Sequence, residues 1–361
     1  MIKPSEYKIV LIGDTLGEGG AERVQARLSI LLNSRGINVH HIIVRDVIEY
    51  KYAGILYNLG LLKSTNNTLL NRLQRFKVLK EYLAKNKFDF IIDFRVKNRF
   101  FQEFIIANYI YKAPYIVSVR SYITEYYFPK NSFLAKFIYK KAYGIVTVSR
   151  AIEEKVKTLY GYNNVSTIYN PIDIENDTVD LKLDYPFIFG IGRMKNNIKQ
   201  FDHLIEAYKN SISKTHNIKL LLAGEGDFKK ELELLVEKEN LTEDVLFLGQ
   251  VNQPNTYFKK AFFTALTSKN EGFPNVLLES LINATPVVAY DCESGPNEII
   301  KDGHNGLLVK NQDISAFTIA INKMITDKDL YANCKVNAQS SVDKFTSDAI
   351  AEEWLKLLRI N

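Results

Sequence analysis

Short apolar segments of β-type composition alternate with helical patterns along nearly the whole chain of 361 residues. This alternation is typical of βαβ units, in which parallel strands form a sheet and helices cover both of its faces. Strands are predicted at KIVLIG, NVHHIIV, FDFIIDF, PYIVSVR and GIVTVS in the first half, and at FIFGIGR, IKLLLAG, VLFLG, FFTALTS, PVVAY and GLLV in the second. We therefore expect an α/β protein with two doubly wound, Rossmann-like domains.

The boundary between these domains is predicted in a polar, proline-bounded stretch at residues 171–186. Such composition is common in linkers, where few contacts cross. The prediction assigns residues 1–170 to an N-terminal domain and residues 187–340 to a C-terminal domain. A C-terminal helix is expected within 341–361, and its return to the N-terminal domain is left open.

Composition excludes several classes of protein. The two cysteines, Cys292 and Cys334, have neither C-x-x-C nor metal-ligand spacing, which argues for a reducing compartment and against a disulfide scaffold or a zinc site. A predicted strand begins within the first residues, so we expect no signal peptide. No segment approaches the ~20 apolar residues of a membrane-spanning helix. A cytoplasmic protein is therefore expected.

Charge is distributed unevenly along the chain. Residues 1–170 contain 26 Lys+Arg and 13 Asp+Glu, a net charge of +13, whereas residues 171–361 contain 21 and 28, a net charge of −7. An imbalance of this kind indicates an anionic partner for the first half. Nucleic acid is disfavoured because no nucleic-acid-binding motif accompanies the basic residues.

One basic segment, NSFLAKFIYKKAYG at 131–144, suggests which anionic partner this is. Aromatic residues such as Phe133 and Phe137 alternate there with Lys136, Lys140 and Lys141. This pattern is typical of an interfacial helix on an anionic membrane surface. A domain helix that buries its apolar stripe in the core is the alternative.

The segment NEGFPNVLLES contains two glutamates, Glu271 and Glu279, with seven residues between them. Pro274 suits the first position of a helix because its missing N–H costs nothing there. Glu271 then lies in the preceding loop, and Glu279 lies roughly 7 Å along the helix axis from Pro274. Such a pair flanks a ligand instead of sharing a proton.

The start of this predicted helix is also a candidate anion site. Unpaired N–H groups at a helix N-terminus favour a phosphate, and the groups expected here belong to Asn275, Val276 and Leu277. The alternative is that Glu279 is a solvated surface glutamate and Glu271 an ordinary loop residue.

The loop after the first strand is rich in glycine. Gly17, Gly19 and Gly20 allow the backbone to approach a ligand closely, and a helix starting near Glu22 directs its N-terminus toward it. The dinucleotide fingerprint G-x-G-x-x-G fits badly because Glu22 stands where the third glycine belongs. This mismatch disfavours a hydride-transfer enzyme, and a tight turn without a ligand is the alternative.

Ligands of doubly wound sheets bind at the carboxyl ends of the strands, which directs attention to the loops of the second half. Arg193 ends its first strand and Lys199 precedes a helix, so both can converge on an anionic leaving group. The following loops supply a glycine turn at 223–230 and main-chain groups at Gln250 and Val251 that can pair with a base edge.

Several of these segments together resemble a known family. They are GGAE at 19–22, GR…K at 192–199, GEG at 224–226, EGFPNVLLE at 271–279 and TPVVAYDCESGPNEII at 285–300. The chain resembles the retaining nucleotide-sugar glycosyltransferases of GT-B fold, of the glycosyl transferases group 1 type that builds bacterial surface polysaccharides. The resemblance spans nearly the whole chain, is most specific in the second half, and implies two domains facing each other across a cleft.

This resemblance implies that the N-terminal domain (1–170) binds the acceptor and that the C-terminal domain (187–340) binds the nucleotide sugar. It also implies roles for individual residues. Glu271 would lie beside the transferred sugar, and Glu279 would hydrogen-bond the ribose hydroxyls. Arg193 and Lys199 would neutralise the departing diphosphate, which makes Glu271, Arg193 and Lys199 the implied catalytic residues. The implied donor-binding positions are Gly19, Gly20, Gly192, Gly224, Gln250, Val251, Phe273, Pro274, Asn275, Val276, Leu277 and Glu279.

The chain departs from the family pattern at two places. Five residues separate Arg193 from Lys199, one more than expected, so Lys195 is an alternative to Lys199. Many members carry a histidine after the fourth strand of the first domain, where this chain has Arg120. His40 and His41 fall inside a predicted strand, which favours a structural role for both.

The implied reaction is retaining sugar transfer from a nucleotide sugar, expected to be UDP-linked, to a lipid-linked saccharide or glycan at the inner membrane face. No cofactor or metal is expected: no D-x-D motif suits a diphosphate-bound cation, and Arg193, Lys199 and helix N-termini can replace one. Two alternatives remain open. One is a non-catalytic nucleotide-binding protein of the membrane surface, and the other is a sugar-nucleotide epimerase of the same fold.

Overall fold

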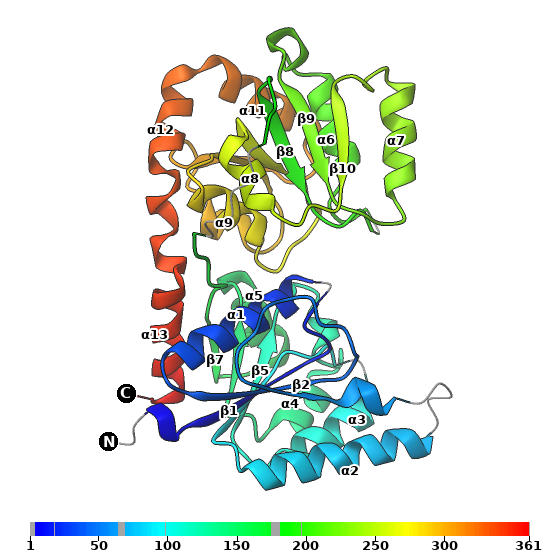
Figure 1. Cartoon of the computed structure of the whole chain (residues 1–361), viewed down its shortest axis with the longest axis vertical. Helices are drawn as coiled ribbons and strands as arrows, with labels where there is room; N and C mark the ends of the chain where they lie inside the picture. Colours follow the sequence, from blue (N-terminus) through cyan, green and yellow to red (C-terminus); the bar gives the residue numbers. More distant parts are fainter. Residues whose placement is uncertain are drawn as a thin grey trace. The chain divides into compact units, whose positions relative to one another are not determined.

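The computed structural model describes residues 4–17, 19–63, 69–97, 99–174, 181–195 and 197–360. The chain divides into two compact units, shown in Figure 1. The N-terminal unit comprises Met1–Pro171 with Ser347–Asn361, and the C-terminal unit comprises Ile172–Thr346. Residues 175–180 of the predicted linker lie outside the described residues. Ile172, also predicted in the linker, forms a β-bridge with Thr346 of the C-terminal unit.

The described part of the N-terminal unit is built on a seven-stranded parallel sheet with the order β3-β2-β1-β4-β5-β6-β7. The strands are β1 (Lys8–Gly13), β2 (Asn38–Ile43), β3 (Ile55–Asn58), β4 (Phe90–Asp93), β5 (Tyr115–Val119), β6 (Gly144–Thr147) and β7 (Val165–Thr167). Strands β3 and β7 were missed by the sequence analysis. Both are short edge strands with partly exposed residues, so they carry little apolar signal.

Helices cover both faces of this sheet. They are α1 (Gly20–Ser34), α2 (Leu69–Asn86), α3 (Phe100–Ile105), α4 (Ser132–Tyr139), α5 (Arg150–Tyr160) and α13 (Ser347–Leu358), with the short turns η1 (Pro4–Glu6), η2 (Leu59–Leu62) and η4 (Thr124–Tyr126) and the π-helix η3 (Ile106–Ile110). Two helix boundaries differ from the prediction. Helix α1 begins at Gly20 instead of near Glu22, and α4 ends at Tyr139 because a turn follows, in which the Ala142 N–H donates to the Tyr139 carbonyl.

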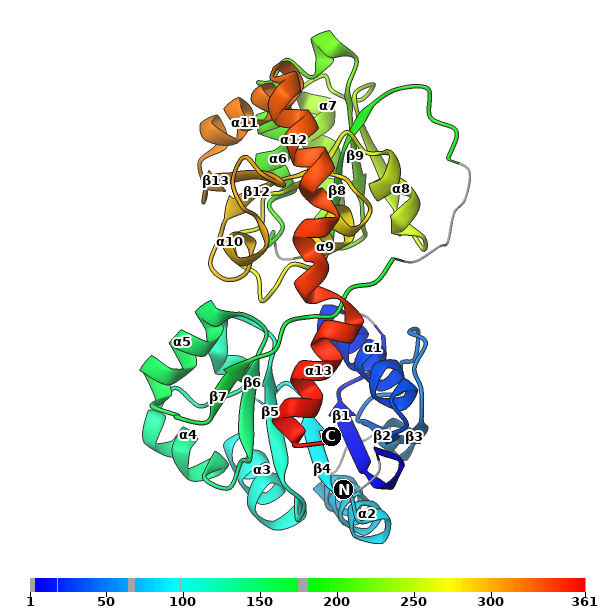
Figure 2. The same cartoon turned by 90° about the vertical axis from the view of Figure 1, so that its left-hand side faces the viewer.

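Helix α13, at the end of the chain, packs within the N-terminal unit. Figure 2 shows it lying along the sheet beside α1. The α13 residues Trp354 and Leu358 are buried in the same apolar cluster as Val24 and Leu28 of α1. Burial of a large apolar side chain stabilises a fold by about 1.5–3 kcal/mol. The C-terminal segment is therefore an integral part of the N-terminal unit.

The C-terminal unit contains, in its described part, a six-stranded parallel sheet with the order β10-β9-β8-β11-β12-β13. The strands are β8 (Phe187–Ile191), β9 (Lys219–Ala223), β10 (Val245–Gly249), β11 (Phe263–Leu266), β12 (Val287–Asp291) and β13 (Gly306–Lys310). The helices are α6 (Phe201–Lys209), α7 (Lys229–Lys238), α8 (Pro254–Lys260), α9 (Asn275–Ile282), α10 (Pro296–Ile299), α11 (Ile314–Thr326) and α12 (Lys328–Ala338), with the turns η5 (Lys214–His216) and η6 (Ser340–Phe345). Each strand predicted for this half of the chain is confirmed.

Strand β9 shows why the prediction succeeded in this unit. Its consecutive residues alternate between two apolar clusters, with Leu220 and Leu222 in one and Leu221 and Ala223 in the other. A parallel strand that is covered by helices on both faces therefore reads as a continuous apolar run. The loops at the carboxyl ends of such strands are left to carry polar residues.

No helix within the described residues combines the length and the apolarity that crossing a membrane requires.

Candidate active site

Three glycines join the loops at the carboxyl ends of β8, β9 and β10. The Gly192 N–H donates to the Ala223 carbonyl at 3.0 Å, and the Gly224 N–H donates to the Gly249 carbonyl at 2.7 Å. Gly224 has φ +138°, and a Cβ there would lie 1.9 Å from the Gly192 carbonyl oxygen. Only glycine fits this position, since both the backbone angle and the contact exclude a side chain. The predicted donor-binding glycines Gly192 and Gly224 thus lie against each other.

A lysine and a glutamate from two different loops form an ion pair beside these glycines. The Lys199 Nζ lies 2.6 Å from the Glu271 Oε1, with side chains 21% and 14% exposed. The aliphatic part of Lys199 lies over Gly192, where a Cβ would come within 2.9 Å of the Lys199 Cε. Glycine at 192 therefore makes room for the lysine. Two of the three predicted catalytic residues are in direct contact.

The loop that carries Lys199 is fixed to the end of β11. The Thr267 Oγ1 donates to the carbonyls of Lys199 and Gln200, at 3.0 and 2.9 Å. Gln200 has φ 45° and precedes α6. Thr267 was not singled out from the sequence, although its position directly after a strand marks it as a candidate. These two hydrogen bonds orient the main chain from which Lys199 extends toward Glu271.

The loop that carries Glu271 is fixed to the end of β12. The Glu271 N–H donates to the Glu293 carbonyl at 3.2 Å, and the Ser294 Oγ donates to the Gly272 carbonyl at 2.6 Å. Ser294 lies inside the motif at 285–300, yet the sequence analysis assigned it no role. The glutamate is thus held by backbone contacts and not only by its ion pair.

The structure distinguishes Lys199 from its alternative, Lys195. Lys195 is exposed and makes no ion pair within the described residues, whereas Lys199 reaches Glu271. The extra residue between Arg193 and Lys199 is therefore accommodated in the loop without displacing Lys199 from Glu271. Arg193 directly follows Gly192 and is exposed.

The start of α9 differs from the prediction by one residue. The helix begins at Asn275, and Pro274 is its N-cap with φ −75° and ψ 97°. Because Pro274 is extended, its carbonyl accepts a hydrogen bond from the Leu277 N–H at 3.1 Å. Leu277 was predicted to offer an unpaired N–H, and this prediction is wrong. The predicted anion-binding donors are reduced to Asn275 and Val276.

Glu279 is a buried residue of α9, with 4% of its surface exposed. The alternative that it is a solvated surface glutamate is therefore wrong. Charged carboxylates are rarely buried unless hydrogen-bond donors or cations surround them. Carboxylate oxygens of a buried glutamate can accept hydrogen bonds from ligand hydroxyl groups.

Phe273 and the loop after β10 surround the start of α9. The ring of Phe273 is buried and packs edge-on against Phe345, with 5.4 Å between the ring centres. Val251 and Val276 belong to one apolar cluster, which brings the loop of Gln250 and Val251 close to α9. Gln250 itself is exposed.

The cysteines do not add a nucleophile to this site. Burial raises the pKa of Cys292 to about 12 and the pKa of Cys334 to about 11. Both thiols are therefore protonated and unreactive at neutral pH. In the part of the chain that the structure describes, no group of three or more His, Cys, Asp or Glu residues is arranged to hold a metal ion.

The remaining candidates lie in the N-terminal unit. Gly19 is the N-cap of α1 and Gly20 is its first residue. The His40 Nδ1 lies 2.7 Å from the Tyr82 hydroxyl, and the His41 Nε2 lies 3.1 Å from the Ala53 carbonyl. These contacts agree with structural roles for both histidines.

Arg120 follows β5, and its guanidinium lies 5.2 Å from the centre of the Phe94 ring. Burial lowers the pKa of Arg120 to about 9, which still leaves it a cation at neutral pH. Its Nε and Nη1 atoms are buried and have no hydrogen-bond partner among the described residues.

Comparisons with known proteins identify the family of this chain. The family model Glycosyl transferases group 1 matches residues 172–341, and Glycosyltransferase Family 4 matches residues 18–176. One relative is the N-acetylgalactosamine-N,N'-diacetylbacillosaminyl-diphospho-undecaprenol 4-alpha-N-acetylgalactosaminyltransferase of Campylobacter jejuni, 32% identical over 95% of this chain and 97% of that protein. Another is the amylovoran biosynthesis glycosyltransferase AmsD of Erwinia amylovora, 23% identical over 98% of this chain and 99% of AmsD.

Solved structures share the fold. TarM has a TM-score of 0.80 at 16% identity, covering 99% of this chain and 100% of TarM. Anabaena Alr3699/HepE in complex with UDP has a TM-score of 0.77 at 18% identity, covering 98% of this chain and 99% of that chain. The predicted GT-B fold is thereby confirmed. Because a relative is 32% identical over nearly its full length, the chain belongs to the group 1 glycosyltransferases and is an enzyme of the hexosyltransferase type.

Proposed function

We propose that this enzyme transfers a sugar from a UDP-linked nucleotide sugar, with retention of the anomeric configuration, to a lipid-linked saccharide or glycan in surface polysaccharide biosynthesis. The observation that carries the proposal is the contact between Lys199 and Glu271 beside the start of α9. The names of the relatives support the acceptor class. One name includes a diphospho-undecaprenol-linked saccharide, and another includes amylovoran. The HepE complex with UDP supports the donor class.

The two side chains of this ion pair have complementary tasks in such a reaction. The bond between the anomeric carbon and the diphosphate breaks, so positive charge develops on the sugar ring and negative charge on the leaving group. Glu271 stabilises the sugar side, whereas Lys199, Arg193 and the N-terminus of α9 stabilise the diphosphate. The carboxylate of Glu271 and the ammonium group of Lys199 are therefore already in contact before the reaction. When the donor bond breaks, each group stabilises the charge of opposite sign that develops beside it.

The acceptor completes the reaction. Its hydroxyl oxygen forms the new bond to the anomeric carbon on the face that the diphosphate leaves, and its proton passes to a departing phosphate oxygen. The products are the glycoside and UDP. Positive charge from Lys199 and Arg193 takes the place of a metal ion in this scheme, so we expect activity to persist in EDTA.

Helix α4 supports a location on the inner membrane surface. Phe133 is 74% exposed and Phe137 is 43% exposed, while Ile138 and Tyr139 are buried. The helix therefore combines the two alternatives from the sequence, with one side in the core and aromatic side chains at the surface. The Lys140 Nζ lies 5.2 Å from the centre of the Phe137 ring, which puts a cation beside this aromatic surface. Aromatic rings flanked by lysines suit an anionic membrane surface.

The test begins with the donor. A panel of UDP, GDP and dTDP sugars is screened by thermal unfolding, since a ligand at ~100 times its Kd stabilises a protein by about 2.7 kcal/mol. The stabilising donor is then incubated with a polyprenyl-diphosphate-linked saccharide, and the product linkage is determined by NMR. Retention predicts the same anomer in the product as in the donor.

The outcomes separate the alternatives. An inverted product contradicts retention, and an isomerised free sugar nucleotide indicates an epimerase. Donor binding without transfer to this saccharide indicates an acceptor of another class. A Glu271→Gln variant that still binds UDP but transfers no sugar is the control that links turnover to this site.

A further inference from the structure

Two glutamines at the carboxyl edge of the C-terminal sheet are hydrogen-bonded to each other in both directions. Gln200 directly follows Lys199 in the chain, and Gln312 lies in the loop after β13. The Gln200 Nε2 donates to the Gln312 Oε1 at 2.8 Å, and the Gln312 Nε2 donates to the Gln200 Oε1 at 2.5 Å. We call these two residues the glutamine pair. It links the loop of Lys199 to a segment more than a hundred residues away in the chain, because the two glutamines are 112 positions apart.

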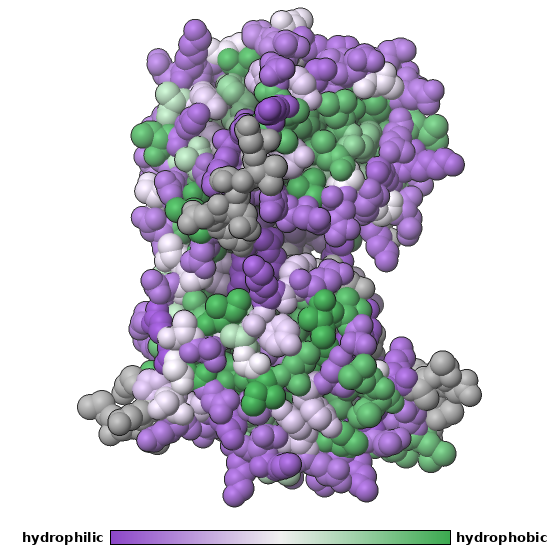
Figure 3. All heavy atoms as spheres, in the orientation of Figure 1, coloured by the Kyte–Doolittle hydropathy of each residue, from purple (hydrophilic) through white to green (hydrophobic). Residues whose placement is uncertain are grey.

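The side chain of Gln200 is unusual because it is buried. Hydrophilic residues cover much of the face shown in Figure 3, as expected for long polar side chains. Gln200 is only 7% exposed, whereas its partner Gln312 is exposed. The Gln200 Nε2 also lies 3.2 Å from the His203 Nε2, and the Gln312 Nε2 also donates to the Asn311 Oδ1 at 3.0 Å. Each amide nitrogen of the glutamine pair therefore has two partners, which fixes the orientation of both amide groups.

The backbone of the glutamine pair is strained at both residues. Gln200 has φ 45° and Gln312 has φ 65°, which is the left-handed region that residues other than glycine seldom adopt. Such strain persists only where the surrounding contacts maintain it, and it is concentrated at functional sites. Gln200 is the N-cap of α6, but its side chain makes no capping hydrogen bond because it reaches Gln312 instead.

Helix α11 provides the fixed end of this link. Gln312 directly precedes Asp313, whose Oδ1 accepts a hydrogen bond from the Ala316 N–H at 2.9 Å and thereby caps α11. The α11 residue Phe317 is buried in the same apolar cluster as Leu204 of α6. The start of α11 is therefore held by a cap and by the core. The glutamine pair connects this fixed point to the loop from which Lys199 extends.

We propose that Gln200 and Gln312 are positioning residues for Lys199. The left-handed turn at Gln200 sets the direction in which the chain leaves Lys199, since the two residues share one peptide bond. Thr267 holds the carbonyls of Lys199 and Gln200, and Gln312 holds the side chain of Gln200. Without Gln312, Gln200 would relax toward a right-handed or extended backbone, and the ammonium group of Lys199 would move away from Glu271. This inference rests on the proposed function and adds residues that orient its lysine.

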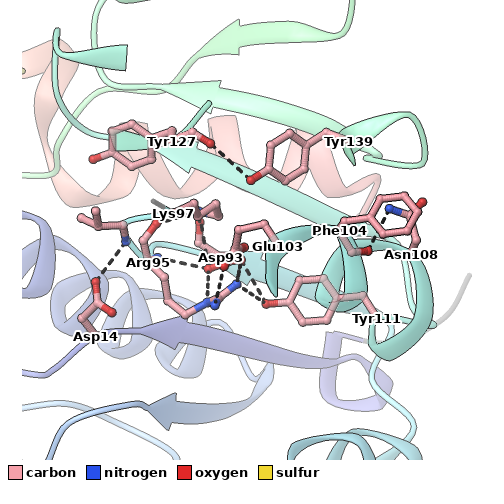
Figure 4. A network of polar contacts seen from close by, with 11 residues as sticks. Asp14, Asp93, Arg95, Lys97, Glu103, Phe104, Asn108, Tyr111, Tyr127 and Tyr139 are labelled. Carbon is pink, nitrogen blue, oxygen red and sulfur yellow. Dashed lines mark hydrogen bonds and ion pairs between the residues drawn. The ribbon is translucent and has the colours of Figure 1, made fainter. Parts of the chain in front are cut away.

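The glutamine pair can be removed without leaving a buried charge behind. A charged network in the N-terminal unit illustrates the opposite case: Figure 4 shows Arg95 between the carboxylates of Asp93 and Glu103. Loss of one partner there leaves an uncompensated ion in the interior. The glutamine pair is uncharged and one of its members is exposed, so its variants should fold.

Glycine substitutions test the role of the glutamine pair. Gln312→Gly removes the amide and tolerates the left-handed backbone, so lost activity cannot be attributed to new strain. Its kcat should fall about 3–10-fold, the size of one net hydrogen bond, and a thermal melt checks that it folds. Gln200→Gly should have the same effect, and the double variant should be no slower than either single variant. The matched control Asn217→Gly changes an exposed left-handed residue that precedes β9, and should keep the parent kcat.

A double-mutant cycle with Lys199 separates positioning from a general structural role. If the glutamine pair acts through Lys199, adding Gln312→Gly to Lys199→Ala should lower kcat by less than about twofold further. A structural role elsewhere in the unit would give the same loss in both backgrounds. Equal losses in the presence and absence of Lys199 would therefore overturn the inference, as would a parent kcat in Gln312→Gly.

Hydrogen-exchange mass spectrometry of the free enzyme needs neither donor nor acceptor. The backbone of residues 197–205 should exchange faster in Gln312→Gly than in the parent, and at the parent rate in Asn217→Gly. Parent exchange in Gln312→Gly would overturn the link between the two loops even if sugar transfer is intact. Failure of the parent enzyme to transfer sugar to any acceptor would instead overturn the proposed function, and the exchange rates would still report on the glutamine pair.

Discussion

Each unit places charged side chains at the carboxyl edge of its own parallel sheet, but the two units balance these charges in different ways. In the C-terminal unit, Lys199 is paired with Glu271 at 2.6 Å. In the N-terminal unit, Arg72 and Arg99 line a cavity without a carboxylate partner among the described residues. A paired acid and base suit a reaction in which charge separates, whereas uncompensated cations suit binding of a stable anion. The sheet edge fixes where a ligand can bind in each unit, and the charged side chains determine which kind of ligand binds there.

Burial separates the ion pairs of the two units as well. The side chains of Arg95 and Asp93 are 6% and 3% exposed, against 21% and 14% for Lys199 and Glu271. Burial alone would raise the pKa of Asp93, but Arg95 and Lys97 outweigh it and hold that pKa below its usual value. The first pair is enclosed and holds the fold, while the second remains accessible to a substrate.

The largest expected effect is on stability, at the enclosed pair. Arg95→Met leaves Asp93 and Glu103 buried without their main cation, so the free energy of unfolding should fall by about 3–5 kcal/mol. Denaturant unfolding measures this change, and the exposed Lys77→Met is the control, with an effect within about 0.5 kcal/mol. If the Arg95→Met variant is as stable as the parent, the buried pair of Arg95 and Asp93 does not stabilise the fold.

The accessible pair should affect turnover instead. Lys199→Ala removes a positive charge aimed at the leaving diphosphate, so kcat should fall about 10²–10³-fold. The matched control Lys195→Ala removes an exposed lysine of the same loop and should change kcat little. Steady-state kinetics with the donor identified by thermal unfolding provides the measurement. The reverse result, a loss in Lys195→Ala alone, would show that the wrong lysine has been assigned.

Acid should destabilise the N-terminal unit through His41. Burial lowers the pKa of His41 from 6.5 to about 4. As the pH falls below 6.5, the unfolded chain binds a proton that the folded state does not take up until about pH 4, so stability is lost across this window. The loss is up to about 3 kcal/mol. His41→Gln should flatten the dependence of unfolding free energy on pH, and His216→Gln, at an exposed position of the other unit, should not.

The positive surplus of the N-terminal unit should also attract membranes. Each lysine near an anionic surface contributes about 1 kcal/mol, so Lys136→Glu/Lys140→Glu/Lys141→Glu should weaken binding to anionic vesicles strongly. Added salt should release the parent protein because it screens this attraction. Co-sedimentation with vesicles rich in anionic lipid measures both effects. If the parent and the triple variant bind equally, α4 is not the membrane contact.

The smallest effect distinguishes the two glutamates of the C-terminal unit. Glu279→Ala should weaken UDP binding about tenfold, the size of one good charge-assisted hydrogen bond, whereas Glu271→Ala should mainly lower kcat. Calorimetric titration with UDP and steady-state kinetics separate these results. If the Glu279→Ala variant binds UDP as tightly as the parent, Glu279 does not hydrogen-bond the ribose.

Much of the fold could be predicted from local sequence patterns. Strands such as β9 are covered by helices on both faces, so their apolar runs are visible without knowledge of their partners. The edge strands β3 and β7 were missed because they are short and partly exposed. The glycine turn at Gly224 was also predicted, as was the placement of Glu271 before a helix and Glu279 inside it. Backbone angle and spacing along a helix are local properties.

The contacts between distant segments could not be predicted in this way. Pattern and spacing left Lys195 and Lys199 as alternatives, and hydrogen bonds from distant residues such as Thr267 orient the loop in which Lys199 meets Glu271. The sequence analysis gave the arginines of α2 no role, and the folding of the loops after β2 and β4 brings them to the lining of one cavity. The amino-acid sequence determined which segments form strands and helices because burial periodicity acts over a few residues. The tertiary structure decided which charges are paired and which are exposed to ligands, because that depends on side chains brought together from distant parts of the chain.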